Sequence, residues 1–557
     1  MRTLHQVTTV TRVPHEHNFM TMVTTTGDHR RPTIPYACAG SSQLENQSST
    51  CGPPHRYVCP GIWGDRMRWT PIKPGRQAFG WRYVAAFVAV MLPWHTAQAQ
   101  TLQDALAKTY QTNPDLAAER ARLRAVDEDV SQANAKWRPS VSLEGDYSLY
   151  SATVKDSASK FDIRSQSWSA DIVARQPLLT SGRNAAAKRQ ALARVRGAVA
   201  RLRAREQRIL LDAATVFVDV LRNEAVLDLV RTDISLLQDL FKEFSDRRDK
   251  AKATDTEVDQ IQAALEAARA TCIANFAELQ DSWRAYEQVV GEPPLAVVVA
   301  VAEDAPRVNP CIDAKGQRLR STLAVPEKLP APPASLEEVE KAAQGKVPEI
   351  DEARAVEEES SHAVSKAYAD LLPSAQITAR LGASGQEYDP ESLKREASIS
   401  AGITIPLFNT GAEWSEIRAA RELNNQARLK ITSSQRQSLR NAVRAWYELV
   451  SIRAIRNVNK VQAATVLRAF EGLRKEIADP KLHRSVTDLL GLRQGYLLTQ
   501  SQLMASNRNE AIAIFTLLAA MGNLNAGYLA LPVEIYDAKA NQKAQATRLV
   551  GDSIHGE

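Results

Sequence analysis

A hairpin of two unusually long alternating segments constrains the fold of this chain most, because it occurs twice. The first copy lies in residues 140–177 and the second in residues 374–406, and each alternating segment has roughly 10 to 12 residues. That length matches a strand tilted across the hydrocarbon core of a membrane (about 9–11 residues) and exceeds the usual strand of soluble proteins (about 5–6). One such hairpin is equally compatible with a soluble sheet that has one wet face. The second copy favours strands that span a membrane.

The segments that flank the hairpins repeat as well. Pro-Ser precedes each hairpin, and a Pro-Leu-(Leu/Phe)-x-(Ser/Thr)-Gly motif follows it at residues 177–182 and 406–411. We therefore expect one helix–hairpin–helix unit used twice, over residues 100–291 and 335–527. A Pro-rich linker over residues 292–334 joins the units, and a polar tail follows over residues 528–557.

Long helices are predicted around both hairpins. Residues 183–249 and 412–478 are two runs of 67 residues without proline. Each would form a helix of about 100 Å at 1.5 Å per residue. Their apolar residues recur at intervals of three and four, which is typical of coiled coils. The remaining predicted helices cover residues 101–136, 255–290, 335–372 and 485–521.

The N-terminal region has the features of a secretory signal. Within residues 67–99, Arg76 and Arg82 precede an apolar run, and Ala97-Gln98-Ala99 supplies the small residues of a cleavage site. Residues 1–66 are polar and lack periodicity, so we expect a non-native or disordered extension. Because they contain three of the five cysteines, a small metal-binding or disulfide module is the alternative.

Cysteine and charge counts limit the function further. Cys272 and Cys311 follow the predicted cleavage site, and in an oxidising compartment they either pair or remain free thiols. The chain has 70 basic and 64 acidic residues, of which residues 1–99 hold 10 and 4. The remaining part therefore has 60 of each (70 − 10 and 64 − 4). It lacks the basic excess that nucleic-acid binding requires.

Four strands in one chain cannot close a membrane barrel, since the smallest spanning barrels have about eight strands and open edges are unfavourable in lipid. The chain is therefore expected to oligomerise. Two copies would give eight strands and a filled interior, whereas three would give twelve strands and room for a water-filled lumen. The polar strand face carries Glu144, Asp146, Asp171, Arg175 and Arg380, which favours the wet interior.

Short motifs in a fixed order resemble the TolC family of outer-membrane efflux and secretion ducts over about residues 100–527. They are the duplicated motif above, Thr-Glu-Val-Asp-Gln at residues 256–260, Ser-Val-Thr-Asp-Leu-Leu at residues 485–490 and Leu-Leu-Ala-Ala-Met-Gly-Asn-Leu at residues 517–524. The resemblance implies an α+β membrane protein of two structural repeats. In it, a homotrimer forms a twelve-stranded transmembrane β-barrel in the outer membrane, with four strands from each protomer, on a long α-helical coiled-coil barrel in the periplasm.

The same resemblance implies a passive exit duct of a tripartite efflux or type I secretion system, gated at its periplasmic tip. Its partners would be a periplasmic adaptor and an inner-membrane pump of the RND or ABC type. Asp488 matches an acidic residue that forms a ring across the tunnel mouth, and Arg484 matches a basic residue that ties the closed helices together.

The acidic partner of that arginine matches Glu257, where the family usually has Asp, with Asp255 as a nearby substitute. A second acidic ring position, one turn after Asp488, is Gly491 here. The alternative is that these acidic residues only stabilise helix N-termini.

No enzyme is expected, because no nucleophile motif, phosphate-binding loop or metal-ligand spacing occurs in the sequence. We accordingly predict no catalytic residue, cofactor or metal. The alternative function is a periplasmic adaptor-type coiled-coil protein that links inner- and outer-membrane components. Such a protein would have a single helical hairpin between β-rich halves.

Overall fold

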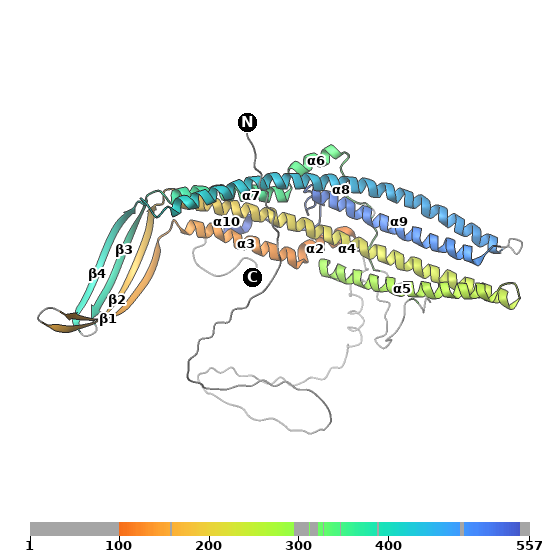
Figure 1. Ribbon diagram of the computed structural model, residues 1–557, viewed down its shortest axis with the longest axis horizontal. Helices are drawn as coiled ribbons and strands as arrows, with labels where there is room; N and C mark the ends of the chain where they lie inside the picture. Colours follow the sequence, from red (N-terminus) through yellow and green to blue (C-terminus); the bar gives the residue numbers. More distant parts are fainter. Residues whose placement is uncertain are drawn as a thin grey trace, which may run out of the picture. The chain divides into compact units, whose positions relative to one another are not determined.

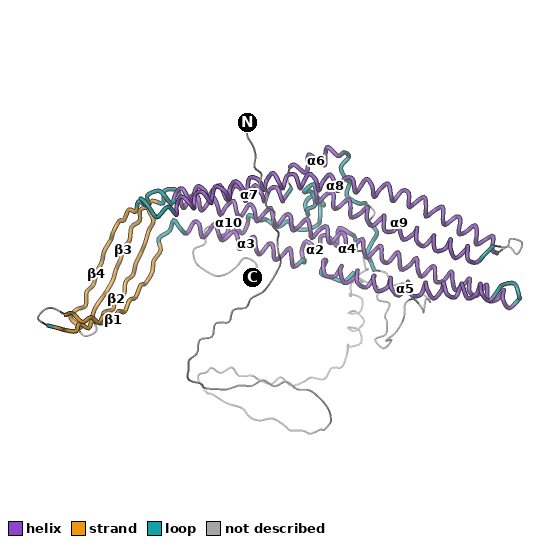
Figure 2. Tube along the Cα trace, in the orientation of Figure 1, coloured by secondary structure: helices purple, strands orange, loops and turns teal. Residues whose placement is uncertain are grey.

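The computed structural model describes residues 100–155, 159–294, 311, 321–326, 328–345, 347–386, 389–478 and 484–545. The predicted extension over residues 1–66 and the predicted signal peptide over residues 67–99 lie outside these residues. In chain order (Figures 1 and 2) the elements are α2 (Leu102–Thr112), α3 (Pro114–Ala135), β1 (Ser140–Lys155), β2 (Lys160–Leu179), α4 (Arg183–Asp249), α5 (Asp255–Val290), α6 (Leu336–Gly345), α7 (Pro348–Ala369), β3 (Ser374–Gln386), β4 (Asp389–Thr404), α8 (Ala412–Ala478), α9 (Val486–Ala520) and α10 (Ala540–Gln545).

The order of elements contains the predicted repeat. Two short helices, a β-hairpin, a helix of 67 residues and a returning helix occur once from α2 to α5 and again from α6 to α9. The four strands have 16, 20, 13 and 16 residues, which is longer than the predicted segments. Within the described residues, no helix is both long enough and apolar enough to cross a membrane.

The predicted single helix before each hairpin is wrong, because each is divided into two helices. Asn113 caps α3, and its Oδ1 accepts hydrogen bonds from the N–H groups of Asp115 (3.0 Å) and Leu116 (3.2 Å). Pro114 follows at the first helical position, where its missing N–H is tolerated. Pro348 occupies the same position at the start of α7.

The duplicated motif ends in the turn that leads from each β-hairpin into its long helix. Ser181 and Gly182 have φ angles of 46° and 89°, and Thr410 and Gly411 have φ angles of 56° and 82°. Two successive residues are thus in the left-handed region, which glycine adopts without a steric penalty. This conformation accounts for the glycine at the end of each motif.

The four strands form one antiparallel sheet in the order β1-β2-β3-β4, and its register separates two faces. One row of directly opposed residues is Leu143, Ile172, Leu381 and Ala397, and the next row is Glu144, Asp171, Gly382 and Glu396. Because successive side chains point to opposite faces, the first row is apolar and the second is acidic. Leu143 is 77% exposed, so the apolar face is uncovered in the protomer.

The helices pack around three groups of buried side chains. The largest group includes Leu106, Phe217 and Phe515 and joins α2, α3, α4 and the C-terminal half of α9. A second group lies between α4 and α5. The third group lies at the turns of the two long hairpins and is described with the candidate site.

The predicted polar tail is packed as far as residue 545. We name residues 523–545 the C-terminal strap. Leu531 is buried, and Tyr536 N–H donates to the hydroxyl of Tyr110 at 3.1 Å. Asn541, on α10, donates to Asp127 Oδ2 on α3 at 2.8 Å. The strap therefore holds to helices that precede it by about 400 residues in sequence.

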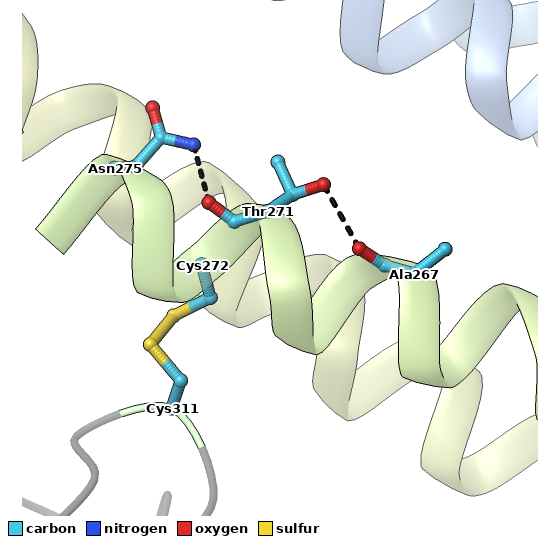
Figure 3. The surroundings of a disulfide bond; sticks show 5 residues. All are labelled: Ala267, Thr271, Cys272, Asn275 and Cys311. Atoms are coloured by element: carbon cyan, nitrogen blue, oxygen red, sulfur yellow. Dashed lines mark hydrogen bonds between the residues drawn. A yellow bond between two sulfur atoms is a disulfide. The ribbon is translucent and has the colours of Figure 1, made fainter.

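The two cysteines that follow the predicted cleavage site form a disulfide (Figure 3). The Sγ atoms of Cys272 and Cys311 are 2.03 Å apart, and both residues are buried. The bond joins α5 to the linker across 39 residues. Nearby, Thr271 and Asn275 donate only to backbone carbonyls one turn earlier on α5. The disulfide therefore attaches the linker to the side of the first long hairpin.

Candidate gate at the tips of the helical hairpins

The four predicted gate residues lie at the two turns of the long hairpins. The first tip turn covers residues 250–254, between α4 and α5, and the second covers residues 479–485, between α8 and α9, of which residues 484 and 485 are described. Asp255 and Glu257 follow the first turn, whereas Arg484 and Asp488 border the second. Each pair thus belongs to a different repeat.

Glu257 is engaged in capping α5. Its Oε2 accepts hydrogen bonds from the N–H of Thr254 at 2.9 Å and from the hydroxyl of the same residue at 3.0 Å. In return, Thr254 Oγ1 accepts the N–H of Glu257 at 3.3 Å. This reciprocal arrangement is a capping box. In the protomer, Glu257 therefore stabilises the N-terminus of α5, which is the role that the alternative interpretation gave it.

Arg484 is paired with a different carboxylate from the predicted one. Its Nε donates to Glu476 Oε2 at 2.9 Å, which ties the last turn of α8 to the start of α9. In the protomer it pairs with neither Glu257 nor Asp255. The Glu257 carboxylate instead accepts two bonds from Thr254, and Glu476 is only eight residues from Arg484 in sequence.

The two predicted aspartates are exposed. The Asp255 side chain is 87% exposed, and its Oδ1 lies 4.0 Å from Arg248 Nε. An ion pair this exposed contributes little to the stability of the fold. Asp488 lies in the first turn of α9 and forms an ion pair with none of the described side chains. A Cβ added at Gly491 would meet no atom within 4 Å. The side of α9 one turn after Asp488 is therefore open in the protomer.

The structure also brings the two tips together. Thr487 Oγ1 donates to Gln260 Oε1 at 3.2 Å between α9 and α5, and Arg247 Nη1 donates to the carbonyl of Ile477 at 3.2 Å between α4 and α8. Below these contacts lies an apolar cluster with members from all four helices: Leu240, Phe244, Val258, Ile261, Phe470, Val486 and Leu489. Opening between the hairpins would separate these groups.

Sequence reasoning missed the charged contacts between α4 and α9, which we name the α4–α9 seam. Arg493 Nη1 donates to Asp233 Oδ2 at 2.6 Å, and the two side chains are 8% and 3% exposed. Farther from the tips, Arg508 makes two bonds to Asp219, at 2.6 and 3.1 Å. Burial raises the pKa of Asp233, and the nearby Arg493 opposes that rise. In the sequence, the feature that could have indicated this contact is a charged residue, Asp233 or Arg493, beside apolar residues on each helix.

Within the described ranges, no group of three or more His, Cys, Asp or Glu side chains is arranged to hold a metal ion. The chain has two long helical hairpins and a four-stranded sheet. This arrangement differs from the single hairpin between β-rich halves that the adaptor alternative requires.

Comparisons with known proteins agree with this architecture. Residues 105–292 match the outer membrane efflux protein family. The outer membrane efflux protein BepC of Brucella suis biovar 1 (strain 1330) is 25% identical over 498 residues, which cover 87% of this chain and 98% of BepC. The sequence similarity therefore extends over both repeats.

Two solved outer-membrane channels share the fold. The CmeC channel of Campylobacter jejuni superposes with a TM-score of 0.63 at 13% identity, over 80% of this chain and 89% of CmeC. The open-state MtrE channel of Neisseria gonorrhoeae gives a TM-score of 0.56 at 16% identity, over 76% and 89%. The family match over residues 105–292, the relative matched over most of its length and the shared fold make the chain similar to outer-membrane efflux proteins.

Proposed function

We propose that three copies of this chain form the outer-membrane exit duct of a tripartite efflux or type I secretion system, and that the duct opens and closes at the hairpin tips. The observation that carries this proposal is a sheet with one apolar and one polar face, attached to two helical hairpins. The apolar face suits lipid and the acidic row suits a water-filled lumen. The long helices continue the passage into the periplasm.

The edges of the sheet support the trimer. In the protomer, β1 and β4 each pair with one strand only, which leaves a backbone edge on either side of the sheet. Unpaired edges are unfavourable in lipid, so β1 of one copy is expected to pair with β4 of the next. Three copies then close a barrel of about twelve strands that is wide enough for an aqueous lumen.

An exposed apolar stripe on α8 supports the same assembly. Tyr447, Val450, Val458 and Val461 are all exposed, and their spacing places them on one side of the helix. Such a stripe is typical of a coiled-coil seam that lacks its partner. A neighbouring copy of the chain would cover it.

The gate would combine repulsion with short-range contacts. Three Asp488 carboxylates that converge on one axis repel one another and attract cations. The Thr487–Gln260 bond links the two hairpins at their tips, and the Arg484–Glu476 pair fixes the second turn between α8 and α9. The similar MtrE channel was solved in an open state, which supports a closed-to-open transition in this fold.

The remaining assignments follow from the duct. A periplasmic adaptor and an inner-membrane pump of the RND or ABC type would dock at the tips and supply the energy, because the duct itself is a passive conduit without a catalytic centre. We further propose that residues 67–99 are the signal peptide and that residues 1–66 are an extension absent from the mature duct.

Single-channel recording tests the proposal. The full-length gene is expressed in a Gram-negative host, and the protein is purified from its outer membranes. Native mass spectrometry should give a trimer, and planar bilayers should show a small, cation-selective conductance that rises in Arg484→Ala. Arg436→Ala, which removes an exposed arginine of α8 far from the tips, is the control and should match the wild type. Monomers without conductance in all three proteins would refute the duct.

A further inference from the structure

The Asp233–Arg493 ion pair joins the two hairpins inside the protomer, across 260 residues of sequence. Arg493 lies seven residues after Val486, the first residue of α9, which is about two helical turns. The pair is therefore close to the tips, where the proposed duct opens. With 3% and 8% exposure, its two charges are shielded from water.

Buried apolar residues lie close to both members of the pair in sequence. Ile234 and Leu237 on α4 and Leu489 on α9 are fully buried. Opposite charges attract strongly in such surroundings, and separating them without water is highly unfavourable. The pair therefore has two favourable arrangements, one with the charges in contact in a dry seam and one with both charges hydrated.

The closed arrangement is incompletely satisfied. Among the described residues, neither Asp233 Oδ1 nor Arg493 Nε has a hydrogen-bond partner, although both atoms are buried. Buried polar atoms without partners weaken the state that buries them. Both atoms would gain water if the seam opened. The pair thus makes partly separated, unhydrated arrangements unfavourable, while its unsatisfied atoms limit how strongly it stabilises the closed seam.

We propose that Asp233 and Arg493 form a latch between the hairpins that controls opening of the duct. Movement of α9 away from α4 requires the two charges to separate, so the latch makes opening an all-or-none event coupled to entry of water. This inference rests on the proposed function, since it assigns a control point to the same gate. It differs from the Arg484–Glu476 contact at the tip because both of its side chains are buried.

The latch predicts opposite effects for single and double substitutions. Asp233→Asn or Arg493→Met leaves one buried charge without its partner, which destabilises the closed seam. The double variant Asp233→Leu with Arg493→Met removes both charges, and replacement of a buried ion pair by apolar residues is often neutral or stabilising. Single variants should therefore open more often than the wild type, and the double variant should open as often or less.

Single-channel recording of the purified full-length protein tests this pattern. We expect each single variant to raise the open probability at least about tenfold, and the double variant to return it to or below the wild-type value. Arg508→Met is the matched control, because the Arg508–Asp219 pair joins the same helices but is about 30% exposed. It should change the open probability far less.

Trimer mass and helical circular dichroism verify folding of each variant. If the single variants fail to assemble, the double variant in an Arg484→Ala background keeps the test decisive, since a conductance above that background would overturn the latch. Equal open probability in the wild type and the folded single variants, alongside a raised conductance in Arg484→Ala, would overturn the latch and leave the duct intact. Absence of conductance in the wild type and in Arg484→Ala would overturn both.

Discussion

Breaking the Cys272–Cys311 disulfide should release the linker from α5 without opening the tips. The bond closes a loop of 39 residues, for which loop-closure entropy gives about 13 cal/mol/K, or about 4 kcal/mol at 25 °C. Since native disulfides often stabilise by less, the expected range is about 2–4 kcal/mol. A free-energy change of that size alters the local opening equilibrium by about 30-fold to 700-fold.

Amide hydrogen exchange reports this opening locally. Ser321 N–H donates to Glu224 Oε1 at 2.7 Å and Ala324 N–H donates to the carbonyl of Gln100 at 3.0 Å, so both amides are protected while the linker is held. Cys311→Ser, or reduction of the wild type, should accelerate exchange in residues 321–326 and leave residues 485–492 unchanged. Unchanged exchange in residues 321–326, with both thiols accessible to an alkylating reagent, would refute the reasoning.

Three further predictions follow from the site and the sheet. Gly491→Asp should assemble normally, because a Cβ there meets nothing within 4 Å, and should increase cation selectivity in bilayers, whereas Asp488→Asn should decrease it. Leu143→Arg, on the apolar strand face, should lower the amount of assembled protein in outer-membrane fractions, since arginine on the lipid face costs about 2–4 kcal/mol near the midplane. Ser142→Arg, on the polar face, is its control. Burial raises the pKa of Asp127, so its contribution to stability is present at low pH and is lost as pH rises through the folded-state pKa. Limited proteolysis of the C-terminal strap should thus increase with pH in the wild type and become less pH-dependent in Asp127→Asn.

The regular elements could be predicted because each obeys one periodicity. The predicted helices over residues 183–249 and 412–478 coincide with α4 and α8, since apolar spacing by three and four persists along the whole run. The breaks at Asn113 and Val347 were not predicted, because a cap followed by proline interrupts a helix without changing its composition. Packing of the strap was also missed. Its polar residues find partners such as Asp127 that are distant in sequence.

In the candidate site too, local features could be predicted from the sequence, whereas contacts between distant residues could not. Motifs located Asp488, Arg484 and Glu257 at the tip turns, because the turns themselves are local features. They gave no sign of the Arg484–Glu476 contact of the protomer, and the pairing of Arg484 with Glu257 in the assembled gate stays a prediction. The buried contact at Arg493 was harder still. No local pattern reports a partner on another helix 260 residues away.

The duplication makes a last prediction about the latch. Aligning the starts of α4 and α8 (offset 412 − 183 = 229) places Gln462 at the position of Asp233, and aligning the caps of α5 and α9 (offset 485 − 254 = 231) places Gln262 at the position of Arg493. Both glutamines are exposed in the protomer. If the repeat symmetry holds in the proposed trimer, α8 of one copy faces α5 of the next, and this pseudo-equivalent seam carries neutral amides where the α4–α9 seam carries charges.

If the charges at Asp233 and Arg493 confer all-or-none opening, a second ion pair introduced between α8 and α5 should stabilise the closed state further. Gln462→Asp combined with Gln262→Arg should lengthen the closed dwell times of the trimer in bilayer recordings, whereas either substitution alone should shorten them, because it introduces an unpaired charge at a protein interface. Identical dwell times in the single and double variants would contradict the arrangement of α8 against α5. A lengthened closed state only in the double variant would show that an ion pair at this seam holds the tips closed as the Asp233–Arg493 pair does, and that the natural chain confines such a pair to the seam between its own two hairpins.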